Sequence, residues 1–190
     1  MSVLAGHRAR PNGWYGMIIL IATEGALFGT FIGTYVYLSF HAPAWPPDGI
    51  AAPSVTAPTV LALVLVAATV PMALAARAGR RDAVAVALAW LALAFVVQAV
   101  YLGLQIHLYV DDLSRFRPQT DAYGSIYFAL LGLHHVHVGV GLLLDLWLFL
   151  RLPQGMTPYR RTALSAIALY WYFVAVAGLA VTAVILSPAW

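Results

Sequence analysis

The chain contains five long apolar stretches separated by short polar segments. The apolar stretches cover about residues 14–40, 58–77, 83–108, 122–150 and 161–187. Each is long enough to cross a bilayer as an α-helix, which needs about 20 apolar residues. None shows the strict apolar–polar alternation typical of membrane β-strands. The pattern predicts an all-α integral membrane protein, in which a bundle of five transmembrane helices forms a single domain, residues 1–190.

The composition agrees with a membrane location. Of the 190 residues, 63% are hydrophobic and only 9% are charged, whereas about a quarter are charged in an average soluble domain. Cysteine is absent, which excludes disulfides, thiolate metal sites and thiol nucleophiles. All ten basic residues are arginines. Because they flank apolar stretches, the net charge of +3 indicates membrane topology and no nucleic-acid partner.

The distribution of arginines predicts how the chain is oriented. Eight lie at one end of the predicted bundle: Arg8, Arg10, Arg77, Arg80, Arg81, Arg151, Arg160 and Arg161. Only Arg115 and Arg117 lie at the other end, beside aspartates. Cytoplasmic loops are enriched in arginine, so we expect the N-terminus in the cytoplasm and the C-terminus outside. Three of these arginines, Arg77, Arg160 and Arg161, are candidates for contact with lipid phosphates.

The first apolar stretch carries two unusual features. Gly25, Gly29 and Gly33 recur every four residues, a spacing that permits another helix to approach closely. Glu24 is the only glutamate of the chain and lies 14 residues from Arg10, near the middle of a bilayer. A carboxyl at that depth costs roughly 2.5–3.5 kcal/mol on insertion scales, so we expect it to face protein.

The fourth stretch carries a second polar group. His134, His137, Gly141 and Asp145 follow one another at spacings of three, four and four residues, which places them on one helix face. His137 matches the depth of Glu24, and Tyr170 and Trp171 of the fifth stretch lie at a similar depth. We therefore predict a buried polar layer of Glu24, His134, His137, Tyr170 and Trp171, with Asp145 nearer the arginines and able to pair with one.

Several functions would suit such a layer. A metal site built from Glu24, His134, His135 and His137 is one, because histidine and carboxylate ligate zinc, iron and manganese. A proton relay is another, since histidine titrates near neutral pH and intramembrane acids mark proton paths. A bis-histidine haem site fits the pattern less well, because it needs histidines on facing helices and all the deep histidines lie on one helix. The simplest role is structural: an interhelical hydrogen bond between Glu24 and a histidine would hold two helices together.

Five motifs follow one another along the chain: ATEGALFGTFIGTYVYL, WPPDG, YLGLQIHLY, YFALLGLHHVHVGVGLL and ALYWYFVAV. Together and in this order, they resemble subunit III of the haem-copper cytochrome c and quinol oxidases in its short five-helix bacterial form. The resemblance runs from Trp14 to about Leu186. It places the glutamate of the family on Glu24 and its two helical histidines on His134 and His137. The Tyr-Trp pair of the family falls on Tyr170 and Trp171.

The chain also departs from that pattern. His135 stands where the family has a glycine, and Tyr172 and Ala175 replace a histidine and an aspartate. Ser165 and Leu108 replace two glutamates. Several membrane acids of the family are therefore missing, while Glu24, His134 and His137 remain. The role of His135 and the electron donor of the complex stay open.

The resemblance implies a supporting subunit without an active centre of its own. Haem and copper are expected in the partner, catalytic subunit I, and the complex would be a proton-translocating oxidase in the bacterial plasma membrane. This chain would stabilise subunit I, contact other oxidase subunits, bind phospholipid and assist proton uptake during oxygen reduction. The alternatives are a homologue associated with nitric oxide reductase, and an autonomous small proton carrier or metalloprotein.

Overall fold

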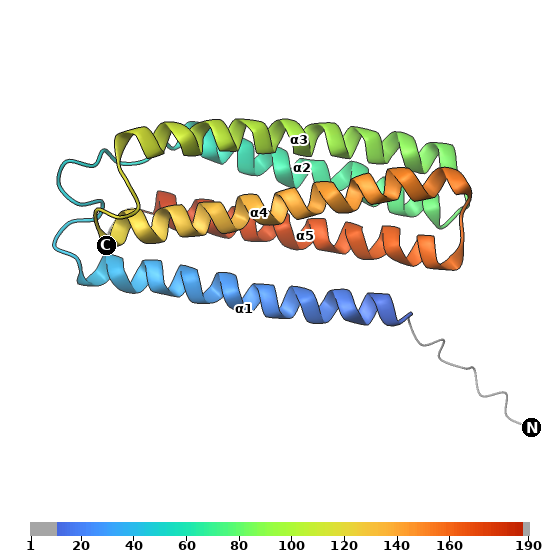
Figure 1. Cartoon of the computed structure of the whole chain (residues 1–190), viewed down its shortest axis with the longest axis horizontal. Coiled ribbons are helices and arrows are strands. Elements are labelled where there is room, and N and C mark those ends of the chain that lie inside the picture. The colour runs from blue at the N-terminus through green and yellow to red at the C-terminus, as the bar shows by residue number, and fades with distance from the viewer. Residues whose placement is uncertain (1–10, 188–190) are drawn as a thin grey trace, which may run out of the picture.

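The computed structural model describes residues 11–187, and over this range the chain is helical with short connections (Figure 1). Five long helices follow one another: α1 (Asn12–His41), α2 (Thr56–Gly79), α3 (Val84–Arg115), α4 (Ala122–Arg151) and α5 (Pro158–Leu186). A single 3-10 turn, Leu152–Gln154, follows α4. All five helices are long and apolar enough to cross a membrane, as the sequence predicts.

The helices run up and down in one bundle, but α1 is less enclosed than the others. α2, α3, α4 and α5 pack against one another, and α1 lies along α4 and α5 at one side (Figure 1). In the most apolar stretch of each helix, 6% of residues are buried in α1, compared with 28–44% in the others. As a result, a groove lies between α1 and α4, with α5 at its base.

The glycine stripe of α1 is not used within the bundle. Within residues 11–187, and apart from the adjoining residues and backbone of α1 itself, no atom lies within 4 Å of the position that a Cβ would take on Gly25, Gly29 or Gly33. The expectation that these glycines let a neighbouring helix approach closely is therefore wrong for the described part of this chain. The reason is rotation of the helix, since α1 turns Phe28 and Tyr35, and not its glycines, toward the bundle.

The third helix is longer than its apolar stretch, ending at Arg115 and not near Leu108. Its last turns are polar, and two contacts hold them. Arg115 forms an ion pair with Asp111 at 2.7 Å, one helical turn earlier. The Tyr127 hydroxyl of α4 donates a hydrogen bond to Asp112 at 2.6 Å. Hydropathy alone misses such an end, because side-chain pairing extends the helix beyond its apolar part.

The next helix begins at a side-chain cap. Asp121 precedes α4 in an extended conformation, and its Oδ1 accepts a hydrogen bond from the Gly124 amide. An aspartate in this position pairs an amide that has no partner inside the helix.

We expect Asp121→Ala to lower the free energy of unfolding by about 1 kcal/mol, the usual cost of losing such a cap. The measurement is a denaturant titration in mixed micelles. Asp48→Ala, at an exposed position in the α1–α2 connection, is the matched control and should leave the transition unchanged. Equal shifts for both variants would show that the cap contributes nothing.

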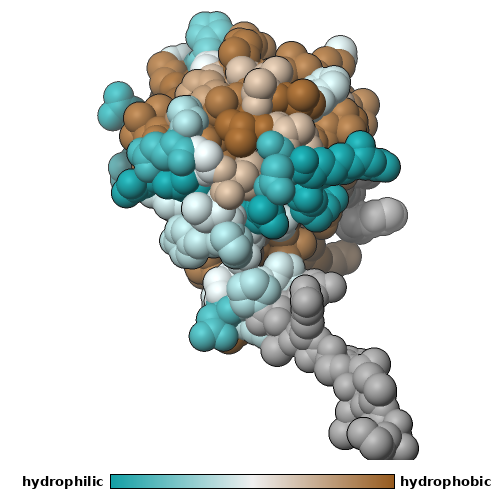
Figure 2. Space-filling view, turned by 90° about the vertical axis from the view of Figure 1, so that its right-hand side faces the viewer, coloured by the Kyte–Doolittle hydropathy of each residue, from teal (hydrophilic) through white to brown (hydrophobic). Residues whose placement is uncertain are grey.

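The described arginines of the basic group gather at one end of the bundle, where α1 begins, α2 meets α3 and α4 meets α5. Figure 2 looks onto this end and shows hydrophilic residues spread over it. Arg161 forms an ion pair with Asp82 at 2.7 Å. Arg160 donates to Gly155 O at 2.6 Å and to Gln154 Oε1 at 2.8 Å. Arg77 is exposed. The other two members, Arg8 and Arg10, lie outside the described residues.

Candidate functional site

The polar residues of α4 share one buried face, as their spacing predicts. His134, His137, Gly141 and Asp145 are all buried. They divide into two groups along the helix axis, however. The histidines meet α1 and α3 in the middle of the bundle, while Asp145 meets α3 and α5 nearer the arginines.

Glu24 and His137 are joined by a hydrogen bond. His137 Nε2 lies 3.1 Å from Glu24 Oε2, so α1 and α4 are linked at the depth that the sequence predicts. The other ring nitrogen, Nδ1, lies 2.8 Å from the Leu133 carbonyl oxygen. A carbonyl oxygen can only accept, so Nδ1 carries a hydrogen.

This geometry fixes the number of hydrogens in the contact. With Nδ1 already donating, Nε2 and Oε2 share one hydrogen between them. The pair is then a neutral imidazole with a protonated carboxyl, or an imidazolium with a carboxylate. Both forms carry the same single proton, and loss of that proton would leave two acceptors facing each other. The Glu24–His137 pair is therefore able to hold one exchangeable proton.

Two aromatic residues support the pair. The Tyr170 hydroxyl donates to the His137 carbonyl oxygen at 2.9 Å, which ties α5 to α4. Phe28 packs edge-on against the His137 ring at 5.0 Å. A hollow of about 240 Å³ opens beside the pair, and Glu24 keeps 27% of its side-chain surface exposed toward it. The proton-holding pair is thus reachable from the α1–α4 groove.

His134 has a different partner. Its Nε2 lies 3.0 Å from the Tyr101 hydroxyl of α3, and the Gln105 amide donates to that hydroxyl at 3.1 Å. Gly178 makes room for the imidazole, because a Cβ there would lie 2.8 Å from His134 Cε1. His134 therefore links α4 to α3, and it is not hydrogen-bonded to Glu24.

Tyr101 and Gln105 are site residues that the motifs of the sequence did not predict. The spacing of polar residues along α3 does, however, indicate them. Gln98, Tyr101 and Gln105 are polar or amphipathic, recur at spacings of three and four within an apolar helix, and are all buried.

The additional histidine, His135, has a different neighbour from those of His134 and His137. His135 is half-buried, and its ring meets that of Tyr109 at 5.4 Å. The four residues considered for a metal site are thus divided among different partners. Within residues 11–187, no three histidine, aspartate or glutamate side chains converge on one point.

Asp145 forms the centre of the second group. The indole Nε1 of Trp171 donates to both of its carboxyl oxygens, at 3.1 and 3.2 Å. The Gln98 amide, with its nitrogen turned toward the carboxyl, donates to Oδ2 at 3.0 Å. Asp145 is 0% exposed, and its described donors are Trp171 and Gln98, so the expectation that it pairs with an arginine is wrong. Trp171 belongs to this group and does not contact Glu24 through its indole nitrogen.

Close packing accompanies these bonds. A Cβ on Gly141 would lie between 2.5 and 2.9 Å from three ring atoms of Trp171. The indole, which is 0% exposed, therefore lies directly on the α4 backbone. The second group holds α3, α4 and α5 together and is closed to solvent.

Comparison with known proteins identifies the family of the chain. Residues 7–187 match the family model described as cytochrome c oxidase subunit III. The chain is 28% identical over 189 residues to cytochrome bo(3) ubiquinol oxidase subunit 3 of Pseudomonas aeruginosa, covering 94% of this chain and 86% of the relative. It is 29% identical over 174 residues to cytochrome c oxidase subunit 3 of Synechocystis sp., covering 89% and 73%. The chain therefore belongs to the cytochrome c oxidase subunit III family.

Proposed function

We propose that the chain is a supporting subunit of a respiratory haem-copper terminal oxidase and that its Glu24–His137 pair assists proton uptake. Its relatives are named as subunits of both cytochrome c and ubiquinol oxidases, so the proposal covers either electron donor. The five membrane-crossing helices support a place beside the catalytic subunit in the bacterial plasma membrane. The arginine-rich end would face the cytoplasm.

Haem and copper would lie in the partner, where they supply the chemistry of oxygen reduction. His134 and His137 each engage a partner within the chain, which fits such a division. Both ring nitrogens of His137 are engaged within the chain, by Leu133 and Glu24. His134 Nε2 is engaged by Tyr101. The buried polar groups of this chain would then hold helices together and hold a proton.

The single observation that carries the proton proposal is the hydrogen bond between Glu24 and His137, which requires one shared hydrogen. In the deprotonated pair, Glu24 Oε2 would accept a proton, which takes the pair from a net charge of −1 to neutral, and would share that proton with His137 Nε2 or return it. Tyr170 positions His137 through its carbonyl oxygen. Arg77, Arg160 and Arg161 would meet lipid phosphates at the cytoplasmic surface.

The test compares Glu24→Gln with Glu24→Leu in the oxidase complex. Glutamine can donate an amide hydrogen to His137 Nε2, so we expect the complex to keep its stability and haem while proton uptake in vesicles slows. Leucine leaves the imidazole unpaired and should also lower the free energy of unfolding by about 1–3 kcal/mol.

His107→Gln is the control, because His107 is exposed on α3, away from the pair. It should leave proton uptake and stability unchanged. Unaltered proton uptake in both Glu24 variants would overturn the proton part of the proposal. It would leave the subunit assignment standing.

A further inference from the structure

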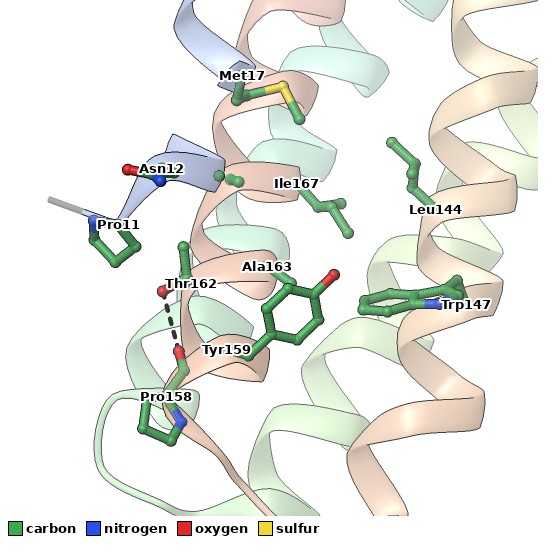
Figure 3. Close-up of a pocket in the computed structure, with 12 residues that line it drawn as sticks. Pro11, Asn12, Met17, Leu144, Trp147, Pro158, Tyr159, Thr162, Ala163 and Ile167 are labelled. Carbon is green, nitrogen blue, oxygen red and sulfur yellow. Dashed lines mark hydrogen bonds between the residues drawn. The ribbon is translucent and has the colours of Figure 1, made fainter. Parts of the chain in front are cut away.

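The hollows at the two ends of the bundle differ in chemical character. At the arginine-rich end, a hollow of about 650 Å³ between α1, α4 and α5 has mostly apolar walls (Figure 3). At the opposite end, a hollow of about 390 Å³ is lined by Asp111, Asp112 and Arg115 of α3 and by residues 49–54 of the α1–α2 connection. Asp111 and Arg115 are exposed, so solvent reaches this second hollow, which we call the entrance hollow.

A smaller hollow, the inner hollow, adjoins the entrance hollow and has walls from α2, α3, α4 and α5. Asp112 and Tyr127 line both, so their hydrogen bond of 2.6 Å lies where the two hollows meet. The inner hollow has a volume of about 40 Å³ and is also lined by Gln105, Tyr109 and Thr182. A buried water needs about 10–15 Å³ and two to four polar partners, so this hollow can hold about two or three waters.

Gln105 joins the inner hollow to His134. Its amide donates to the Tyr101 hydroxyl at 3.1 Å, and that hydroxyl lies 3.0 Å from His134 Nε2. Because the tyrosine oxygen accepts the amide hydrogen, its own hydrogen is available to Nε2, and the neutral imidazole then carries its hydrogen on Nδ1. That nitrogen is buried with no hydrogen-bond partner among the described residues. His134, which is 2% exposed, is therefore the end of a polar chain that starts at the inner hollow.

Phe28 separates this chain from the Glu24–His137 pair. Its ring meets the ring of His134 edge-on at 6.5 Å and the ring of His137 at 5.0 Å. A phenyl ring has no N–H or O–H group to pass a proton between the two imidazoles. Glu24 and His137 line the hollow beside α1, whereas His134 is linked to the inner hollow. Two histidines one turn apart on α4 are thus served from different hollows.

We propose that the inner hollow binds ordered water and gives His134 access to solvent from the end of the bundle opposite the arginines. Gln105 forms the inner wall of this water site. When its side chain turns away, a water from the hollow replaces its amide at the Tyr101 hydroxyl. A proton delivered by that water enters the tyrosine oxygen as the hydroxyl hydrogen moves to His134 Nε2, which leaves an imidazolium. The reverse steps release the proton.

The inference goes beyond the proposed function. It concerns a different histidine, a different hollow and the opposite end of the bundle. It holds whether or not the Glu24–His137 pair assists proton uptake.

The experiment places the intact oxidase complex in heavy water and follows the ring Cε1 hydrogen of each histidine as deuterium replaces it. Mass spectrometry with fragmentation that resolves His134, His135 and His137 gives the rates. Because this exchange needs a protonated ring and a base from water, it reports on both parts of the proposal. We expect His134 to exchange, more slowly than the exposed His107. A His134 ring that stays unlabelled after His107 has exchanged completely would overturn the water path.

Two substitutions should change the exchange of His134 in opposite directions. Thr182→Leu fills the inner hollow and should slow it. Gln105→Ala removes the hydrogen bond that must break and should speed it about fivefold, the factor for roughly 1 kcal/mol, the usual net contribution of one hydrogen bond. Thr59→Leu, at an exposed position on α2, is the matched control and should leave the rate unchanged. His137 should keep its wild-type rate in all three variants.

The rates of His134 and His137, compared within one sample, separate the path from a general effect on the bundle. Equal changes at both histidines in Thr182→Leu and Gln105→Ala would overturn the proposal, as would an unchanged His134 rate in both variants. Haem content and thermal stability are measured in the same samples. If one variant fails to fold, the wild-type rate and the other variant decide.

Discussion

Replacing Trp171 by alanine is expected to lower the free energy of unfolding by about 3–5 kcal/mol, the range found for removing a fully buried aromatic side chain. The indole is 0% exposed and fills the space between α4 and α5. Within a bilayer this cost comes from lost dispersion contacts, since lipid is as apolar as the helix interior. The buried carboxyl of Asp145 also loses its indole donor.

Two further variants separate these contributions. Trp171→Phe keeps most of the ring volume but removes the N–H group, so we expect about 1–3 kcal/mol for the weakened pairing of Asp145. Trp90→Ala removes an indole that is only half-buried on α3 and should cost less than Trp171→Ala. The readout is a denaturant titration in mixed micelles. Comparable losses for Trp90→Ala and Trp171→Ala would contradict a special role for the buried group.

Gly141→Ala is expected to destabilise the bundle by about 1–3 kcal/mol, the usual effect of overpacking a filled core. The added methyl group would meet three atoms of the Trp171 ring, with the nearest at 2.5 Å. The ring cannot retreat easily, because its nitrogen is bonded to Asp145. One of the two helices would have to move.

Gly139→Ala supplies the matched control on the same helix. Among the described residues, no atom outside the adjoining part of α4 lies within 4 Å of its Cβ position, and alanine favours the helix by about 1 kcal/mol over glycine. This variant should therefore be neutral or stabilising in the same titration. A Gly141→Ala protein as stable as Gly139→Ala would show that the contact between α4 and α5 is looser than described.

Much of the architecture follows directly from the apolar stretches, because only helices satisfy backbone groups at this hydropathy and length. The meeting of Glu24 and His137 was predictable as well, since both lie at the same depth relative to the arginines. The partners of His134 and Asp145 were not, because they depend on how α3 and α5 rotate about their axes. Depth along a helix can be counted in a sequence, but rotation is set by packing.

The same distinction explains the glycine stripe of α1. Its period predicts a close contact, yet the period does not say whether the neighbour belongs to the same chain. In the described residues the stripe faces outward and Phe28 faces inward. Asp145 shows the opposite case, because its nearness to arginines in sequence predicts an ion pair, whereas its face of α4 turns it to Trp171 and Gln98.

Purification of the tagged chain in mild detergent, followed by a reduced-minus-oxidised optical spectrum, tests the central claim most directly. We expect the haem bands of a co-purifying catalytic subunit, in stoichiometric amount with this chain. The haem types seen would also identify the class of oxidase. A stable, haem-free preparation of the chain alone, obtained again with lipid present throughout, would contradict its assignment as an oxidase subunit.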